Sequence, residues 1–200
     1  CILFACTSKS ENQASLIEQS QPEFTQPANW DSLFQVSFHS DQFTDQLLHK
    51  QEKVLREIDS ILPLVPPEQK NALQAIKGEY NRQHYRYLTE FHKDLSVGKP
   101  YLETARQLAL LLNDSVLMVD CLDVESHFQF LHGQADTAIN LRLKALEFTK
   151  AQGDTTRTFI LLRRCFKMLN SSGRYEEALK LIEYSIPFSR KAKDGDGKPT

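Results

Sequence analysis

The chain has 200 residues, of which 40% are apolar and 25% are charged, and its formal net charge is −2. This composition is that of an ordinary globular domain with a hydrophobic core. It offers no basic stripe of the kind that binds nucleic acid, so we expect no nucleic-acid partner. No apolar run reaches the roughly 18–20 residues that a membrane-spanning helix needs.

The first six residues resemble the end of a bacterial signal peptide. Leu3, Phe4, Ala5 and Cys6 are similar to a lipobox, in which a small residue before the cysteine lets the peptidase approach the backbone. The resemblance implies that Cys6 carries lipid and anchors an exported protein in the cell envelope, as a periplasmic or outer-membrane lipoprotein. The alternative is an apolar chain end without such a role.

Residues 7–29 are rich in Ser, Gln, Asn and Glu, and Pro22 and Pro27 would interrupt any helix. We expect a disordered polar tether there. Residues 30–38 are rich in aromatic and apolar side chains, which predicts a short segment that docks on the first helices as an N-terminal cap.

The following part of the chain is expected to form an N-terminal helical hairpin or cap over residues 30–96. Apolar residues at steps of three and four predict a first helix over residues 41–62. A second helix is expected from Pro67 to about residue 94, with a weak point at Gly78. The sequence at residues 97–100, Val-Gly-Lys-Pro, predicts a helix end followed by a restart.

The C-terminal half is predicted to contain five helices joined by short turns, and no segment is typical of a strand. Helices of this length with such short turns become antiparallel neighbours. The expected helices cover residues 101–112, 115–131, 136–151, 155–170 and 175–189.

This half also repeats itself at a spacing of 40 residues. The segment 133–138 (Gly-Gln-Ala-Asp-Thr-Ala) returns as 173–178 (Gly-Arg-Tyr-Glu-Glu-Ala), and Ala105, Ala145 and Ser185 share one column. A fixed period of this size indicates stacked supersecondary units, each of which buries its apolar face against the next. We therefore expect Gly133 and Gly173 to occupy equivalent corners.

Gly173, Tyr175 and Ala178 resemble the signature of the tetratricopeptide repeat, in which a small residue lets two helices approach closely. The resemblance implies an all-α fold of antiparallel helix pairs stacked as a right-handed superhelix, an α-α solenoid, over residues 97–200. The period exceeds the usual value of about 34, which indicates extended helices. The last repeat lacks a polar capping helix, so we expect the array to be truncated.

In that family the first helix of each pair lines a concave groove. The resemblance therefore implies a groove lined by Asp120, Asp123, His127, Phe130, Ile160, Arg163, Lys167 and Asn170. Basic and amide donors on residues 155–170 would hold a carboxylate or an extended peptide, and the acidic pair on the neighbouring helix would make the groove bipolar. The alternative is that these residues form solvated helix faces.

Cys121 and Cys165 lie on apolar helix faces, where buried thiols are the first interpretation and a disulfide between neighbouring repeats is the second. The spacings of His127 with His132, and of His84 with His92, match no metal motif. No nucleophile elbow or phosphate-binding loop is present in the sequence. We therefore expect neither metal, cofactor nor enzymatic activity.

Two functions fit these patterns. The first is a non-enzymatic scaffold that binds a protein or peptide and is attached to a membrane through Cys6. The second is the sensory repeat region of a longer bacterial signal-transduction regulator, whose kinase or DNA-binding output domain would follow in the gene.

Overall fold

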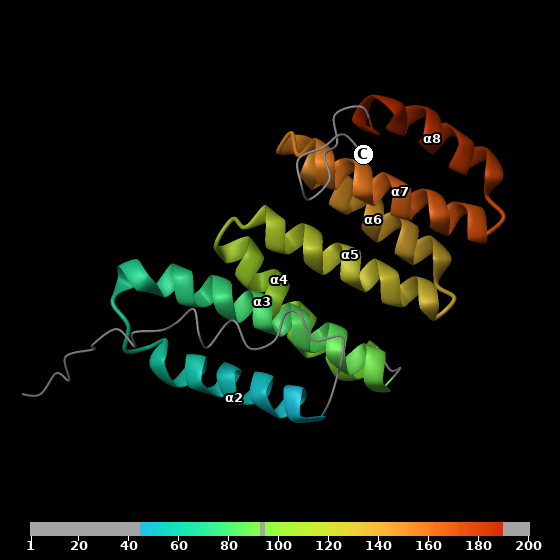
Figure 1. The fold of residues 1–200 in the computed structure, drawn as a ribbon. Coiled ribbons are helices and arrows are strands. Elements are labelled where there is room, and N and C mark those ends of the chain that lie inside the picture. The colour runs from blue at the N-terminus through green and yellow to red at the C-terminus, as the bar shows by residue number, and fades with distance from the viewer. Residues whose placement is uncertain (1–44, 93–94, 190–200) are drawn as a thin grey trace, which may run out of the picture. The chain divides into compact units, whose positions relative to one another are not determined.

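The computed structural model describes residues 45–92 and 95–189, which form seven α-helices and no strand (Figure 1). The all-α prediction is confirmed for this part of the chain. The helices are α2 (Asp45–Ile61), α3 (Pro67–His92), α4 (Leu95–Leu111), α5 (Ser115–Leu131), α6 (Ala135–Ala151), α7 (Thr155–Ser171) and α8 (Tyr175–Ser189). The predicted lipid site at Cys6, the tether, the segment 30–38 and the end of the chain after Ser189 lie outside the described residues.

The helices from α4 to α7 follow a regular plan. Each has 17 residues, and each is joined to the next by a turn of three residues. Every turn contains one residue with a positive φ, at Asn113 (52°), Gly133 (78°), Gly153 (69°) and Gly173 (73°). Glycine adopts this left-handed conformation without steric cost.

The four turns also share their hydrogen bonds. In each, the backbone N–H of the residue after the corner donates to a carbonyl five positions earlier, as from Gln134 to Gln129 and from Arg174 to Leu169, both 2.9 Å. This is the hydrogen bond that closes a Schellman motif. The prediction that Gly133 and Gly173 occupy equivalent corners is confirmed.

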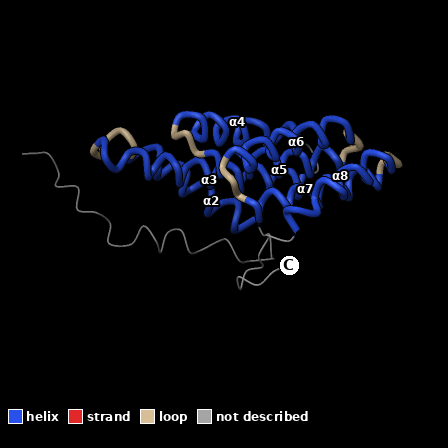
Figure 2. The backbone as a smooth tube through the Cα atoms, turned by 90° about the horizontal axis from the view of Figure 1, so that it is seen from above, coloured by secondary structure: helices blue, strands red, loops and turns tan. Residues whose placement is uncertain are grey.

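Helix pairs are the units of packing. Contacts are most extensive within the pairs α3–α4, α5–α6 and α7–α8, and α3 also contacts α5. In Figure 2, α3, α5 and α7 lie on one side of this array and α4 and α6 lie on the other. The right-handed superhelix that the resemblance implies stays a prediction.

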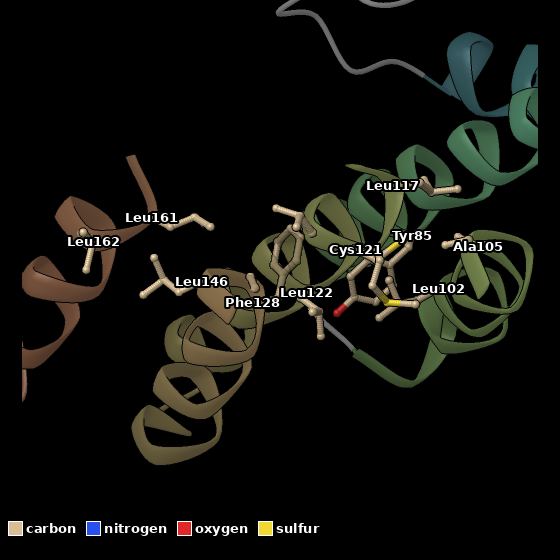
Figure 3. Close-up of a cluster of buried hydrophobic side chains, with 14 residues drawn as sticks. Tyr85, Leu102, Ala105, Leu117, Cys121, Leu122, Phe128, Leu146, Leu161 and Leu162 are labelled. Atoms are coloured by element: carbon tan, nitrogen blue, oxygen red, sulfur yellow. The ribbon is translucent and has the colours of Figure 1, made fainter. Parts of the chain in front are cut away.

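A hydrophobic core runs from α3 to α7 between the two layers (Figure 3). Ala105 and Ala145 are both fully buried in it, at the predicted spacing of 40 residues. Cys121 and Cys165 are buried and free, which confirms the interpretation as space-filling thiols. Burial raises the pKa of the Cys121 thiol to about 12, so it stays protonated at neutral pH.

The predicted helix break at residues 97–100 is wrong. Helix α4 begins at Leu95 and continues through Pro100. A Cβ added to Gly98 would lie 2.7 Å from Cδ2 of Tyr85 and 3.1 Å from its backbone oxygen. Gly98 therefore permits the close approach of α3 and α4, at the position where the next pairs carry the buried Ala138 and Ala178. Gly98 is therefore a packing residue, whereas its position close to Pro100 had indicated a helix end.

The predicted weak point at Gly78 is also wrong, because α3 is one continuous helix of 26 residues. A Cβ at Gly78 would collide with the side chain of Leu117 in α5, so this glycine also marks a close contact between helices. Helix α3 packs far more extensively against α4 than against α2.

Candidate functional site

A groove of about 650 Å³ opens on the layer formed by α3, α5 and α7. Five basic and three acidic side chains line it, together with apolar ones. The basic residues are Arg82 and Arg86 from α3, Arg142 from α6, and Arg164 and Lys167 from α7; the acidic residues are Glu90, Asp120 and Asp123.

The structure brings together five of the eight residues that the sequence assigned to a groove. Asp120, Asp123, His127, Phe130 and Lys167 line this cavity, whereas Ile160, Arg163 and Asn170 do not. Helix α7 instead contributes Arg164, Met168 and Ser171, so its part of the lining begins further along the helix than expected.

A buried ion pair forms the floor of the groove. The side chain of Arg142 is 4% exposed, and its Nε donates to Oδ1 of Asp123 at 2.9 Å. Its Nη1 lies 3.1 Å from Sδ of Met168. Burial lowers the pKa of the Arg142 guanidinium, and the charge of Asp123 opposes this shift. A buried charge is tolerated only when it is paired and hydrogen-bonded.

A second arginine reaches the same carboxylate from α7. Arg164 pairs with Oδ2 of Asp123, and half of the Arg164 side chain remains exposed to the groove. Asp123 therefore pairs with two arginines, the buried Arg142 and the half-exposed Arg164. Its charge is engaged within the protein.

The other acid of the predicted acidic pair is also occupied. Oδ1 of Asp120 lies 3.5 Å from Nη1 of Arg157. Burial raises the pKa of the Asp120 carboxyl, while Arg157 and Arg82 lower it. Both predicted acids are thus paired with arginines. Arg82 and Arg86 are paired as well, with Glu79 and Glu90 of α3.

Two further lining residues, His127 and Lys167, are exposed in the groove. Lys167 is exposed and has no acidic partner among the residues that the structure describes. Burial lowers the pKa of His127, and the nearby Arg142 contributes in the same direction. His127 is therefore neutral at pH 7 and offers hydrogen bonds without charge.

Arg142 is absent from the predicted groove residues, because the prediction assigned the groove to the first helix of each pair and Arg142 belongs to a second helix. A signal was present in the repeat itself. Arg142 stands between Leu102 and Ile182 in one 40-residue column, where an apolar residue is typical. An arginine in an apolar column indicates a buried charge whose partner must be nearby.

Within residues 45–92 and 95–189, no three His, Cys, Asp or Glu side chains are arranged to hold a metal ion. None of the described helices has the length and apolar character required to cross a bilayer. Comparisons of the chain with protein-family models, with curated proteins and with solved structures find no match.

Proposed function

We propose that this protein is a non-enzymatic binding module that holds an acidic peptide segment of a partner protein in the groove. The observation that carries the proposal is the excess of basic over acidic side chains around the cavity. Four of the five basic side chains already pair with Glu79, Glu90 or Asp123. The positive charge that a ligand can meet is therefore that of Lys167 and of the half-exposed Arg164.

The exposed basic groups lie where an incoming carboxylate would meet them. The ammonium group of Lys167 has no acidic partner among the described residues, and the Arg164 side chain stays half exposed although it pairs with Asp123. Guanidinium and ammonium groups form charge-assisted hydrogen bonds with carboxylates. Arg82 and Arg86 line the same groove from α3, where Glu79 and Glu90 compensate their charges.

Apolar side chains add a second requirement on the ligand. Val124, Phe130 and Met168 line the groove beside the basic groups. Binding sites commonly combine such apolar surface with a few polar groups that fix orientation. The peptide best suited to this groove alternates acidic with apolar residues and lies across α5 and α7, in the manner expected for a tetratricopeptide-like array.

Fluorescence anisotropy with two labelled peptides tests this function. One peptide alternates Glu with Leu, and the other replaces each Glu by Lys. We expect the acidic peptide alone to bind, and its affinity to fall with added salt because exposed charges are screened. Lys167→Glu should weaken binding about tenfold.

Lys144→Glu is the matched control, because Lys144 is exposed on α6 and does not line the groove. It makes the same change of net charge without altering the site. Equal losses in the two variants, or equal binding of the basic peptide, would contradict the proposed function.

A further inference from the structure

An apolar stripe runs along the exposed side of α8. Tyr175, Leu179, Ile182 and Ile186 recur at steps of three and four residues, which places them on one face of the helix. They are 67%, 58%, 40% and 45% exposed. In Figure 1, α8 is the last of the described helices and has α7 beside it. A continuous exposed stripe of this kind is typical of an interaction surface.

The repeat shows what such a stripe accommodates. Forty residues earlier, the equivalents of Leu179, Ile182 and Ile186 are Ile139, Arg142 and Leu146, each 3% exposed. Ile139 shares a buried cluster with Cys165, Met168 and Leu169 of α7, and Leu146 shares one with Leu161 and Leu162 of α7. The side of α6 that matches the stripe is therefore covered by an amphipathic helix.

A charged group at the end of the stripe repeats as well. Asp136, near the start of α6, accepts a hydrogen bond of 2.8 Å from Arg174, which lies three residues beyond the end of α7, the helix packed on α6. The equivalent of Asp136 in α8 is Glu176. Glu176 is exposed and has no basic partner among the described residues. The helix that fits α8 should therefore be followed, shortly beyond its C-terminal end, by a basic residue.

We propose that the α8 stripe binds an amphipathic helix of a partner protein, in the way that α6 binds α7. The helix presents apolar residues at steps of three and four and places an arginine or lysine, just beyond its C-terminal end, against Glu176. This surface is separate from the groove and takes a ligand of opposite charge.

The acidic edge of α8 argues against two other occupants. Glu176 and Glu183 lie on the same side of the stripe. Two copies of α8 packed antiparallel would bring these edges together, and like charges in contact oppose association. An anionic lipid surface would be repelled by the same edge.

A peptide made from α7 itself, residues 155–174, is a direct probe, because it already packs on the equivalent surface of α6. We measure binding of the labelled peptide to the full 200-residue chain under reducing conditions. We expect binding that Leu179→Glu and Ile182→Glu each weaken about tenfold or more. Leu110→Glu, at a 70% exposed position of α4, is the matched control and should leave it unchanged.

A charge exchange tests the predicted orientation. Glu176→Arg should weaken binding of the peptide, and a peptide carrying Arg174→Glu should recover the loss with that variant alone. Absence of binding, or equal effects of Leu110→Glu and Ile182→Glu, would overturn the proposal. So would self-association of the chain, or its binding to anionic vesicles, that Ile182→Glu abolishes.

Discussion

The helices α4 to α8 and the helices α2 and α3 solve the same packing problem in two ways. From α4 to α7 the helices have the same length, the corners up to α8 are equivalent, and small residues recur where helices cross. By contrast, α3 has 26 residues, and the connection before it contains Pro63 and Pro66. The packing of α4 to α8 follows a repeated sequence pattern, whereas the packing of α2 and α3 depends on contacts that occur only once in the chain.

Buried polar side chains of α2 and α3 make these contacts. Gln51, Asn81 and His84 are nearly inaccessible to solvent. Nδ1 of His84 lies 3.2 Å from Oε1 of Gln51, which joins α3 to α2. The His84 ring packs against that of Tyr101 in α4, with centroids 4.3 Å apart. A buried polar group stabilises only the arrangement that satisfies its hydrogen bonds, so these contacts specify how α2 docks.

The largest effect is expected where the regular region also buries a charge. Asp123→Ala should reduce the free energy of unfolding by about 3–5 kcal/mol, because Arg142 would stay buried without its partner. Arg142→Leu, which restores the residue type of Leu102, should cost much less, since Asp123 keeps Arg164. Urea denaturation of both variants measures the difference. A larger loss in Arg142→Leu would contradict this account.

A smaller loss is expected at the junction of the two regions. Gly98→Val should cost about 3 kcal/mol, because the new side chain meets both the ring and the backbone of Tyr85. Gly133→Ala is the control. Nothing lies within 4 Å of its added Cβ, so only the strain of the positive φ remains, about 1 kcal/mol. Equal midpoints in urea would show that Gly98 is not a packing position.

At the last crossing within the regular region, Ala178→Leu should destabilise by about 2 kcal/mol through overpacking. Lys167→Ala should leave the melting temperature almost unchanged, because its side chain is exposed. The two melting curves therefore separate a packing residue from a groove residue. Equal shifts would mean that the faces of α7 and α8 are assigned incorrectly.

The irregular region should respond to pH. Burial lowers the pKa of His84 below its ordinary value of 6.5, although Glu52, whose Oε1 lies 4.0 Å from Nε2, acts in the opposite direction. The unfolded chain then binds the proton more readily, so the free energy of unfolding falls as the pH drops below 6.5. His84→Gln should flatten this dependence between pH 7 and 5. If the pH dependence of the free energy of unfolding is unchanged in His84→Gln, it arises from other groups, such as His127.

The smallest predicted effect is a gain within the regular region. Asp114 and Asp154 cap α5 and α7 by accepting hydrogen bonds from Leu117 and Arg157, both 2.9 Å, whereas Gln134 makes no such bond for α6. Gln134→Asp should therefore stabilise the protein by about 1 kcal/mol. Gln134→Asn should give a similar gain, and a loss in thermal melting for both would show that the corner does not permit capping.

The sequence predicted the regular region well because its corners are local. Gly133, Gly153 and Gly173 mark turns whose backbone requires a positive φ, a demand visible in the residue type alone. The predictions at Gly98 and Gly78 were wrong, because a neighbouring helix requires glycine at these positions. Contacts between distant segments leave no local signal, so a packing glycine and a terminating glycine look alike in sequence.

The groove was predictable only in part for the same reason. Helical spacing placed Asp120, Asp123, His127 and Phe130 on one face of α5, and that face lines the cavity. How far the cavity extends along α7 depends on how the helix pairs stack. The periodicity of the sequence does not predict this stacking. Arg142 reaches the groove from the other layer by passing between helices, and the repeat revealed it only as an exception in its column.

Because the corners are equivalent, a segment of 40 residues can be deleted or duplicated as one unit. Removing residues 134–173 would join Gly133 directly to Arg174, and the new turn would contain the same left-handed glycine followed by the start of a second helix. An excision or duplication of forty residues therefore changes the length of the array while leaving its layers in order. A change of twenty residues would move each following helix into the other layer, and would break the layer of α3, α5 and α7 on which the groove opens.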